Sequence, residues 1–117
     1  MKRDYRLYID DILEAIKKIE KYTERMTMED FLKDDKSIDA VTRNFQIIGE
    51  AVKNLPADFK RKRKDIEWKK IAGLRDRIIH YYFGVNWDIL WDVIKNQLPR
   101  LKEQVEGILE QLEAQKI

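Results

Sequence analysis

One apolar seam near the C-terminus constrains the fold more than any other feature of this 117-residue chain. The seam consists of Trp87, Trp91, Ile94, Leu98, Leu101, Val105, Ile108 and Leu112. Its steps alternate between four and three residues, which places every member on one side of a helix about 39 Å long. Pro99 lies inside the seam and predicts a kink there. A seam of this length needs other helices to cover it.

Two further stripes predict the covering helices. The first consists of Tyr5, Tyr8, Ile12, Ala15, Ile19 and Tyr22, and is widened by Ile9, Leu13 and Ile16. The second consists of Ile38, Val41, Phe45, Ile48, Val52 and Leu55. Between them, Thr27 is the expected N-cap of a short turn with Asp30 three residues later, and Asp34 or Asp35 opens the second helix. Pro56 ends that helix.

A third helix is expected to begin near Glu67 and to end at Gly84, after which Asn86 caps the seam helix. Its apolar positions are Ile71, Leu74, Ile78 and Tyr81. The polar and basic segment from Pro56 to Asp65 suits a surface connection or a single helical turn. We see no strand pattern of any length.

Helices with heptad-like stripes and short connections pack best at about 20° to one another. We therefore expect an all-α, up-and-down four-helix bundle with short extra turns, in a single domain that spans residues 1–117. Leu90, Val93 and Leu109 lie beside the seam and are candidates to cover a partner chain instead. A symmetric homodimer would bury them.

Composition excludes several classes of function. The chain has no cysteine, which removes disulfides and thiolate sites, and its one histidine makes a metal site unexpected. No cofactor is predicted. No apolar run approaches the roughly 20 residues of a membrane span, so we expect a cytoplasmic protein that has no membrane partner.

Local charge, rather than overall charge, decides whether the chain can bind nucleic acid. Charged residues make up 39% of the sequence, yet the formal net charge is only +2. The run KRKRK, which consists of Lys60, Arg61, Lys62, Arg63 and Lys64, can hold an RNA backbone through phosphate contacts. It can equally be a solvated loop.

The segment GLRDRIIHYY, from Gly73 to Tyr82, is the best candidate for chemistry. It holds His80, five residues after Arg75 and two before Tyr82. Cleaving RNA without a metal requires proton transfer, which suits a histidine, and charge stabilisation, which suits the planar fork of an arginine. Tyr82 can donate to phosphate, orient the histidine or stack on a base. Because one histidine cannot be base and acid at once, a site that uses histidine for both roles needs two chains.

This arrangement of an arginine, four residues, a histidine, one residue and a tyrosine resembles the signature of the HepT-like branch of the HEPN ribonucleases. Three other segments are similar to family segments in family order: DYRLYIDDILEAIKKIEKYT, RNFQIIGEAVKNLP and WKKIAGLRDRIIHYYFGVNWDILW. Asp76 departs from the pattern, since relatives commonly place Asn there, and its carboxylate can pair with Arg75.

The resemblance implies a metal-independent endoribonuclease whose site forms at a homodimer interface, with RNA such as tRNA or mRNA as substrate. It also implies the toxin half of a toxin–antitoxin system, paired with a nucleotidyltransferase antitoxin that adds AMP to the motif tyrosine in some relatives. Tyr82 is where that modification would fall. The alternative is a non-catalytic helical dimer that binds the nucleotidyltransferase or a nucleotide.

The spacing of the motif raises a geometric question. At about 100° per residue, Tyr82 falls within roughly 20° of Arg75 around a regular helix, while His80 lies about 140° away. Either the helix unwinds near His80 or the cleft takes residues from two protomers, and the resemblance favours the shared cleft. Arg77 is a further candidate RNA contact. Arg43, Asn44, Glu50 and Asp76 are candidates to support the cleft from behind, or are ordinary bundle-surface residues.

Overall fold

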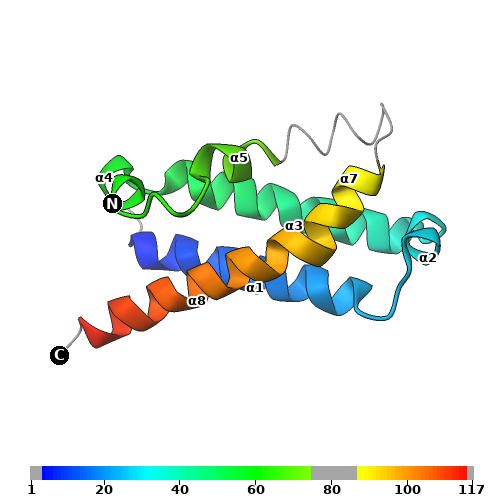
Figure 1. Ribbon diagram of the computed structural model, residues 1–117, viewed down its shortest axis with the longest axis horizontal. Coiled ribbons are helices and arrows are strands. Elements are labelled where there is room, and N and C mark those ends of the chain that lie inside the picture. The colour runs from blue at the N-terminus through cyan, green and yellow to red at the C-terminus, as the bar shows by residue number, and fades with distance from the viewer. Residues whose placement is uncertain (1–3, 75–86, 116–117) are drawn as a thin grey trace.

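The computed structural model describes residues 4–74 and 87–115, and every regular element in these two ranges is helical. The elements are α1 (Tyr5–Thr23), α2 (Met28–Leu32), α3 (Asp35–Asn54), α4 (Ala57–Arg61), α5 (Trp68–Ala72), α7 (Trp87–Asp92), the π-helical turn η1 (Val93–Gln97) and α8 (Leu98–Ala114). The expected all-α class is therefore confirmed. Helices α1 and α3 lie side by side along the molecule, and α8 runs across them (Figure 1).

Side-chain caps set the turn between the two long N-terminal helices. Thr27 and Asp30 form a reciprocal capping box at the start of α2, as the sequence predicted. The carboxylate of Asp34 accepts hydrogen bonds from the backbone N–H and the hydroxyl of Ser37, which makes Asp34 the N-cap of α3. Leu55 ends α3 directly before Pro56, again as predicted.

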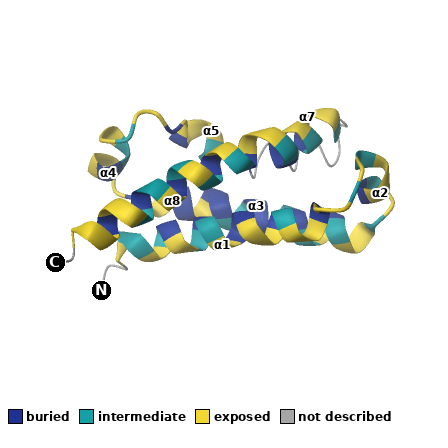
Figure 2. Ribbon diagram, turned by 60° about the horizontal axis from the view of Figure 1, so that its bottom comes forward, coloured by how far each residue is buried: buried dark blue, intermediate teal, exposed yellow. Residues whose placement is uncertain are grey.

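The core lies between α1, α3 and α8, whose buried residues face one another (Figure 2). All six residues of the second predicted stripe are buried, five on α3 and Leu55 at its C-cap, and so is the seam from Ile94 to Leu112. One stripe position is wrong: Tyr22 is 38% exposed, and its neighbour Thr23 is buried instead. Thr23 can be buried because its hydroxyl donates a 2.8 Å hydrogen bond to the carbonyl of Ile19.

The third helix departs from expectation within the part that the structure describes. Glu67 is the N-cap of α5, close to the predicted start, but α5 ends after five residues at Ala72. Gly73 is the C-cap, and its N–H bonds to the carbonyl of Lys69. Glycine supports a helix poorly because it loses the most backbone freedom, which is the reason for the break. The predicted Gly84 and Asn86 caps lie outside the described residues.

The seam helix contains a π turn directly before Pro99, at the place where the sequence predicts a kink. The N–H of Leu98 donates to the carbonyl of Val93, five residues earlier, across η1. In a regular helix the ring of Pro99 would clash with the carbonyl of Lys95, and Pro99 has no N–H to bond it. Widening the preceding turn relieves this conflict, so Pro99 begins the first turn of α8 instead.

Two apolar residues at and before the π turn are not available to a partner. Leu90 and Val93 are only 3% and 4% exposed, because they belong to the core of this one chain. Their expected role as a surface for a partner chain is therefore wrong. A π turn advances fewer degrees per residue than an α-helix, which draws more apolar positions onto the core side. None of the described helices is both long enough and apolar enough to cross a membrane.

Candidate functional site

The predicted motif residues lie between the two described ranges of the chain, 4–74 and 87–115. Arg75, Asp76, Arg77, His80 and Tyr82 all fall in 75–86, outside the described residues. The described chain stops at Leu74, which is buried beside α5, and resumes at the start of α7. The site can therefore be built from the surfaces that surround these two ends.

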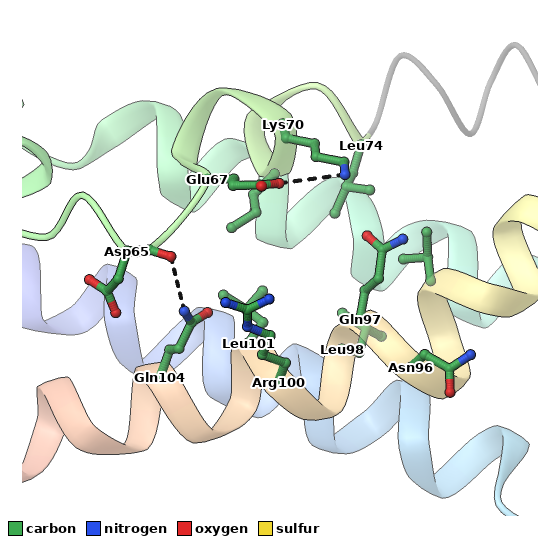
Figure 3. A pocket seen from close by; sticks show the side chains of 12 residues that line it. Asp65, Glu67, Lys70, Leu74, Asn96, Gln97, Leu98, Arg100, Leu101 and Gln104 are labelled. Atoms are coloured by element: carbon green, nitrogen blue, oxygen red, sulfur yellow. Dashed lines mark hydrogen bonds and ion pairs between the residues drawn. The ribbon is translucent and has the colours of Figure 1, made fainter.

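A cavity of about 260 Å³ lies directly beside Leu74 (Figure 3). It is lined by Asp65, Glu67, Lys70, Ile71, Leu74, Val93, Asn96, Gln97, Leu98, Arg100, Leu101 and Gln104. Apolar residues therefore line part of the cavity and charged or amide side chains line the rest. Lys70 pairs with Glu67 at 3.5 Å on α5, and the amide of Gln104 donates a 3.1 Å hydrogen bond to the carbonyl of Asp65. The second contact fixes α8 against the connection that leads into α5.

Two of the amides beside this cavity are held by one carboxylate. The side-chain N–H groups of Asn96 and Gln97 donate to the two oxygens of Asp92, at 2.6 and 3.3 Å. These hydrogen bonds, first the one from Asn96 and then the one from Gln97, hold the pKa of Asp92 below its usual value because they stabilise the charged carboxylate. The contacts orient amide groups at the rim of the cavity.

A second hollow, here named the basic groove, has a volume of about 740 Å³. It is lined by Lys53, Ala57, Lys60, Arg61, Lys64, Ile66, Glu67, Trp68, Lys69, Lys70 and Ala72. These residues come from the C-terminal end of α3, from α4, from α5 and from the connection between α4 and α5. Six cationic side chains therefore share one groove with a single carboxylate.

Several charges of the basic groove already have partners. Arg61 forms an ion pair with Asp58, and Glu67 pairs with Lys70. The ammonium of Lys60 donates a 3.3 Å hydrogen bond to the carbonyl of Val52 in the last turn of α3. The negative end of the helix dipole stabilises a positive charge at this place.

The remaining groove cations are Lys53, Lys64 and Lys69. All three are exposed, and within residues 4–74 and 87–115 none of them has an ion-pair partner. These three ammonium groups are therefore available to an anion.

The structure separates the members of the KRKRK run. Lys60, Arg61 and Lys64 line the basic groove, whereas Lys62 and Arg63 do not. The guanidinium of Arg63 lies over the ring of Phe59, at 4.0 Å from the ring centroid. The backbone carbonyl of Arg63 accepts a 3.0 Å hydrogen bond from the Trp68 indole. Arg63 thus packs α4 against the start of α5.

Three of the residues expected to support the cleft, Arg43, Asn44 and Glu50, lie within the described ranges. None of them lines the cavity beside Leu74 or the basic groove. Arg43 and Glu50 are exposed and line a groove of about 320 Å³ between α1 and α3, together with Tyr8 and Asp11. Asn44 is buried, and its amide donates a 2.8 Å hydrogen bond to the carbonyl of Ala40 one turn earlier. Arg43 and Glu50 thus share a groove that Asn44 does not line.

Sequence reasoning missed three cations of the basic groove: Lys53, Lys69 and Lys70. A continuous run of like charge drew attention to residues 60–64, while Lys53 lies on α3 and Lys69 and Lys70 lie on α5. One feature of the sequence could have indicated this grouping: Pro56 ends α3, and the segment between Pro56 and α5 is short enough to bring α5 back against α3. Packing of α5 on α3 then brings the separate lysines together.

Comparison with known proteins places the chain among ribonucleases. A family model described as ribonuclease HepT-like matches residues 12–108. "Putative RNase MJ0127" of Methanocaldococcus jannaschii is 46% identical over 114 residues, which cover 97% of this chain and 94% of that protein. "Probable ribonuclease HepT" of Thermococcus cleftensis is 48% identical over 108 residues, covering 92% and 98%. No solved structure matches the chain significantly. This all-helical chain belongs to the ribonuclease HepT-like family.

Proposed function

We propose that this protein is a metal-independent endoribonuclease. The observation that carries the proposal is the occurrence of Arg75, His80 and Tyr82 at the motif spacing, in a chain of the ribonuclease HepT-like family. The names of its relatives point to RNA as the substrate class. The chemistry of the three side chains suits cleavage that uses the 2′-hydroxyl as nucleophile.

Each motif residue has a distinct role in the proposed reaction. His80 takes the proton from the 2′-hydroxyl, and the oxygen attacks the adjacent phosphorus. Arg75 stabilises the extra negative charge on the phosphorane, and Tyr82 positions the phosphate or a base. The 5′-oxygen leaves with a proton, which a second histidine supplies. That histidine is His80 of the other protomer.

The proposed assembly follows from this need for two histidines. The chain forms an up-and-down four-helix bundle, and two such bundles pair about a two-fold axis with the motif residues at their interface. A cleft shared by both protomers also removes the difficulty that a regular helix directs His80 about 140° away from Arg75.

The proposed biological role is that of a toxin in a toxin–antitoxin system. Its partner is a nucleotidyltransferase antitoxin that adds AMP to Tyr82. A bulky anion on this tyrosine would repel RNA phosphate and occupy the cleft, which explains how one modification would silence the enzyme. Antitoxin-treated protein without added mass on the peptide that contains Tyr82 would contradict this part of the proposal.

The decisive test is cleavage of total RNA and purified tRNA by the isolated protein in excess EDTA. We expect the parent to cleave and a folded, dimeric His80→Ala variant to lose at least 100-fold in rate, the lower range for a general acid or base. Failure of a verified, unmodified dimer to cleave any of several RNA pools would overturn the proposal. Equal cleavage by both proteins would indicate a contaminant or another site.

Asp76 favours one alternative function, a non-catalytic helical dimer that binds the nucleotidyltransferase or a nucleotide. Its carboxylate can pair with Arg75 and so compete with phosphate for the guanidinium. In that case His80→Ala lowers the melting temperature or the dimer affinity without changing any RNA cleavage. An Asp76→Asn variant separates the functions further, because it raises the cleavage rate only in an enzyme.

A further inference from the structure

We propose that the basic groove binds the phosphodiester backbone of the substrate RNA and leads it toward the motif segment. This inference rests on the proposed ribonuclease function and adds a binding surface to it. The groove combines parts of three helices that are separate in the sequence, so the surface exists only in the folded chain.

The charge of the groove is unusual for this molecule. Six cations and one carboxylate line it, although the whole chain carries a net charge of only +2. Acidic residues gather elsewhere, as on the exposed side of α8, where Glu103, Glu106, Glu110 and Glu113 recur at helical spacing. Positive charge is therefore concentrated at the groove rather than spread evenly over the protein, which steers a polyanion to one face.

The groove offers cations that are free to contact phosphates. Lys53, Lys64 and Lys69 have exposed ammonium groups, and the described residues provide no ion-pair partner for any of them. Lysine makes a flexible point contact with phosphate, which suits binding that does not depend on base sequence. These lysines come from α3, from α5 and from the connection between α4 and α5, so three separate elements supply the free cations of the groove.

The walls of the groove are formed before any ligand arrives. Ile66 and Trp68 line the groove and are buried, 4% and 9% exposed. The Trp68 indole donates to the carbonyl of Arg63, and the Trp68 ring lies 6.2 Å from that of Phe59. A preformed surface lowers the ordering cost of binding.

The position of the groove relates it to the motif. Lys69 and Lys70 lie on α5, six and five residues before Arg75. Helix α5 ends at Ala72, and the described chain stops two residues later, at the start of the motif segment (Figure 1). RNA that follows α5 through the groove toward its C-terminal end therefore approaches Leu74, the residue directly before Arg75.

The test measures RNA binding apart from cleavage. All proteins carry His80→Ala, so the RNA stays intact, and the ligand is a short fluorescent single-stranded RNA of mixed sequence followed by anisotropy over a range of KCl concentrations. The groove variant combines Lys53→Gln, Lys64→Gln and Lys69→Gln. Its matched control removes the same charge from exposed lysines outside the groove, by Lys17→Gln, Lys21→Gln and Lys36→Gln.

We expect the groove variant to bind about 100-fold more weakly at about 0.1 M salt, because each single-strand phosphate contact contributes about 0.7 to the slope of log K against log salt. The slope should fall by about 2 for three lost contacts. The control should keep the parent slope. Replacing the same three groove lysines with arginine should restore binding, since it keeps the positive charge.

Two outcomes would overturn the inference. One is RNA binding whose affinity and salt slope do not change in the groove variant, and the other is an equal loss in the groove variant and its control. Either outcome leaves the ribonuclease proposal standing, because that proposal is decided by cleavage in EDTA. Conversely, groove-dependent binding by a parent that never cleaves would support the groove and reject the enzyme.

Discussion

The ammonium of Lys95 donates a 2.8 Å hydrogen bond to the backbone carbonyl of Thr23, 72 residues earlier in the chain. Lys95 lies in η1, and Thr23 is the last residue of α1. The same ammonium lies 4.8 Å from the centre of the Trp91 ring. One cation therefore joins the π turn to the negative end of the α1 dipole, where a positive charge is stabilised.

Replacing Lys95 with methionine tests this connection. Methionine keeps most of the apolar side chain but removes the charged donor, so we expect a loss of about 1.5 kcal/mol in the free energy of unfolding. Urea denaturation with an unchanged m value would measure it. Lys18→Met is the control, because Lys18 makes only an exposed pair with Glu14 at 3.6 Å and should change stability by less than about 0.5 kcal/mol.

Replacing Phe45 with alanine tests the core between α1, α3 and α8. The Phe45 side chain is fully buried, so its removal leaves a cavity and should cost about 3 to 5 kcal/mol. Gln111→Ala, on the exposed side of α8, should stay within about 0.5 kcal/mol. Similar losses in both variants by thermal or urea unfolding would contradict the assigned core.

The N-cap of α3 predicts a dependence of stability on acid pH. Hydrogen bonds from the hydroxyl and then the backbone N–H of Ser37 lower the pKa of Asp34 below its usual value. The charged form therefore contributes stability that is present above the unfolded pKa of about 3.9 and is lost as pH falls through the folded pKa.

An Asp34→Asn variant isolates this contribution, because asparagine still caps the helix but does not ionise. The difference in unfolding free energy between parent and variant should be constant from about pH 7 to pH 5 and shrink below about pH 4. Urea titrations across this range would measure it. A difference that stays constant down to about pH 2.5 would contradict the role of the ionised carboxylate.

The proposed chemistry predicts different effects for two neighbouring arginines. Arg75→Lys keeps the positive charge but loses the planar fork that reaches two phosphoryl oxygens, so kcat should fall about 10- to 100-fold. Arg77→Lys, at a candidate phosphate contact, should change mainly KM. Initial rates over a range of RNA concentrations distinguish the two. Equal effects on kcat would argue against a special role for Arg75.

The long helices could be predicted from the sequence because their apolar spacing is regular and each stripe is buried by another. The N-caps at Thr27 and Asp34 could also be predicted, since a capping side chain bonds within its own turn. The sequence was misleading where a glycine or a proline interrupts an otherwise regular apolar stripe, because the stripe favours a continuous helix and these residues disfavour it. Gly73 interrupts a stripe that otherwise reads as one helix, and Pro99 is accommodated by a π turn that the apolar spacing does not reveal.

The candidate site could be predicted only in part. The spacing of Arg75, His80 and Tyr82 is local and visible in the sequence, and it stays a prediction because these residues lie outside the described ranges. The basic groove depends on contacts between separate helices, so no single stretch of sequence reveals it. Arg63 shows the converse, since a residue in a charged run can pack on an aromatic ring.

The ion pair between Arg6 and Glu113 joins the first turn of α1 to the last turn of α8, because α1 begins on the side of the molecule where α8 ends (Figure 1). The start of α1 and the end of α8 are therefore held close together. Circular permutation should be tolerated, with a short glycine and serine linker from Ala114 to Asp4 and new termini between Glu24 and Arg25, in the exposed turn after α1. Such a rearranged protein would carry its new ends far from the Arg6–Glu113 contact and would leave the order of helices around the core unchanged.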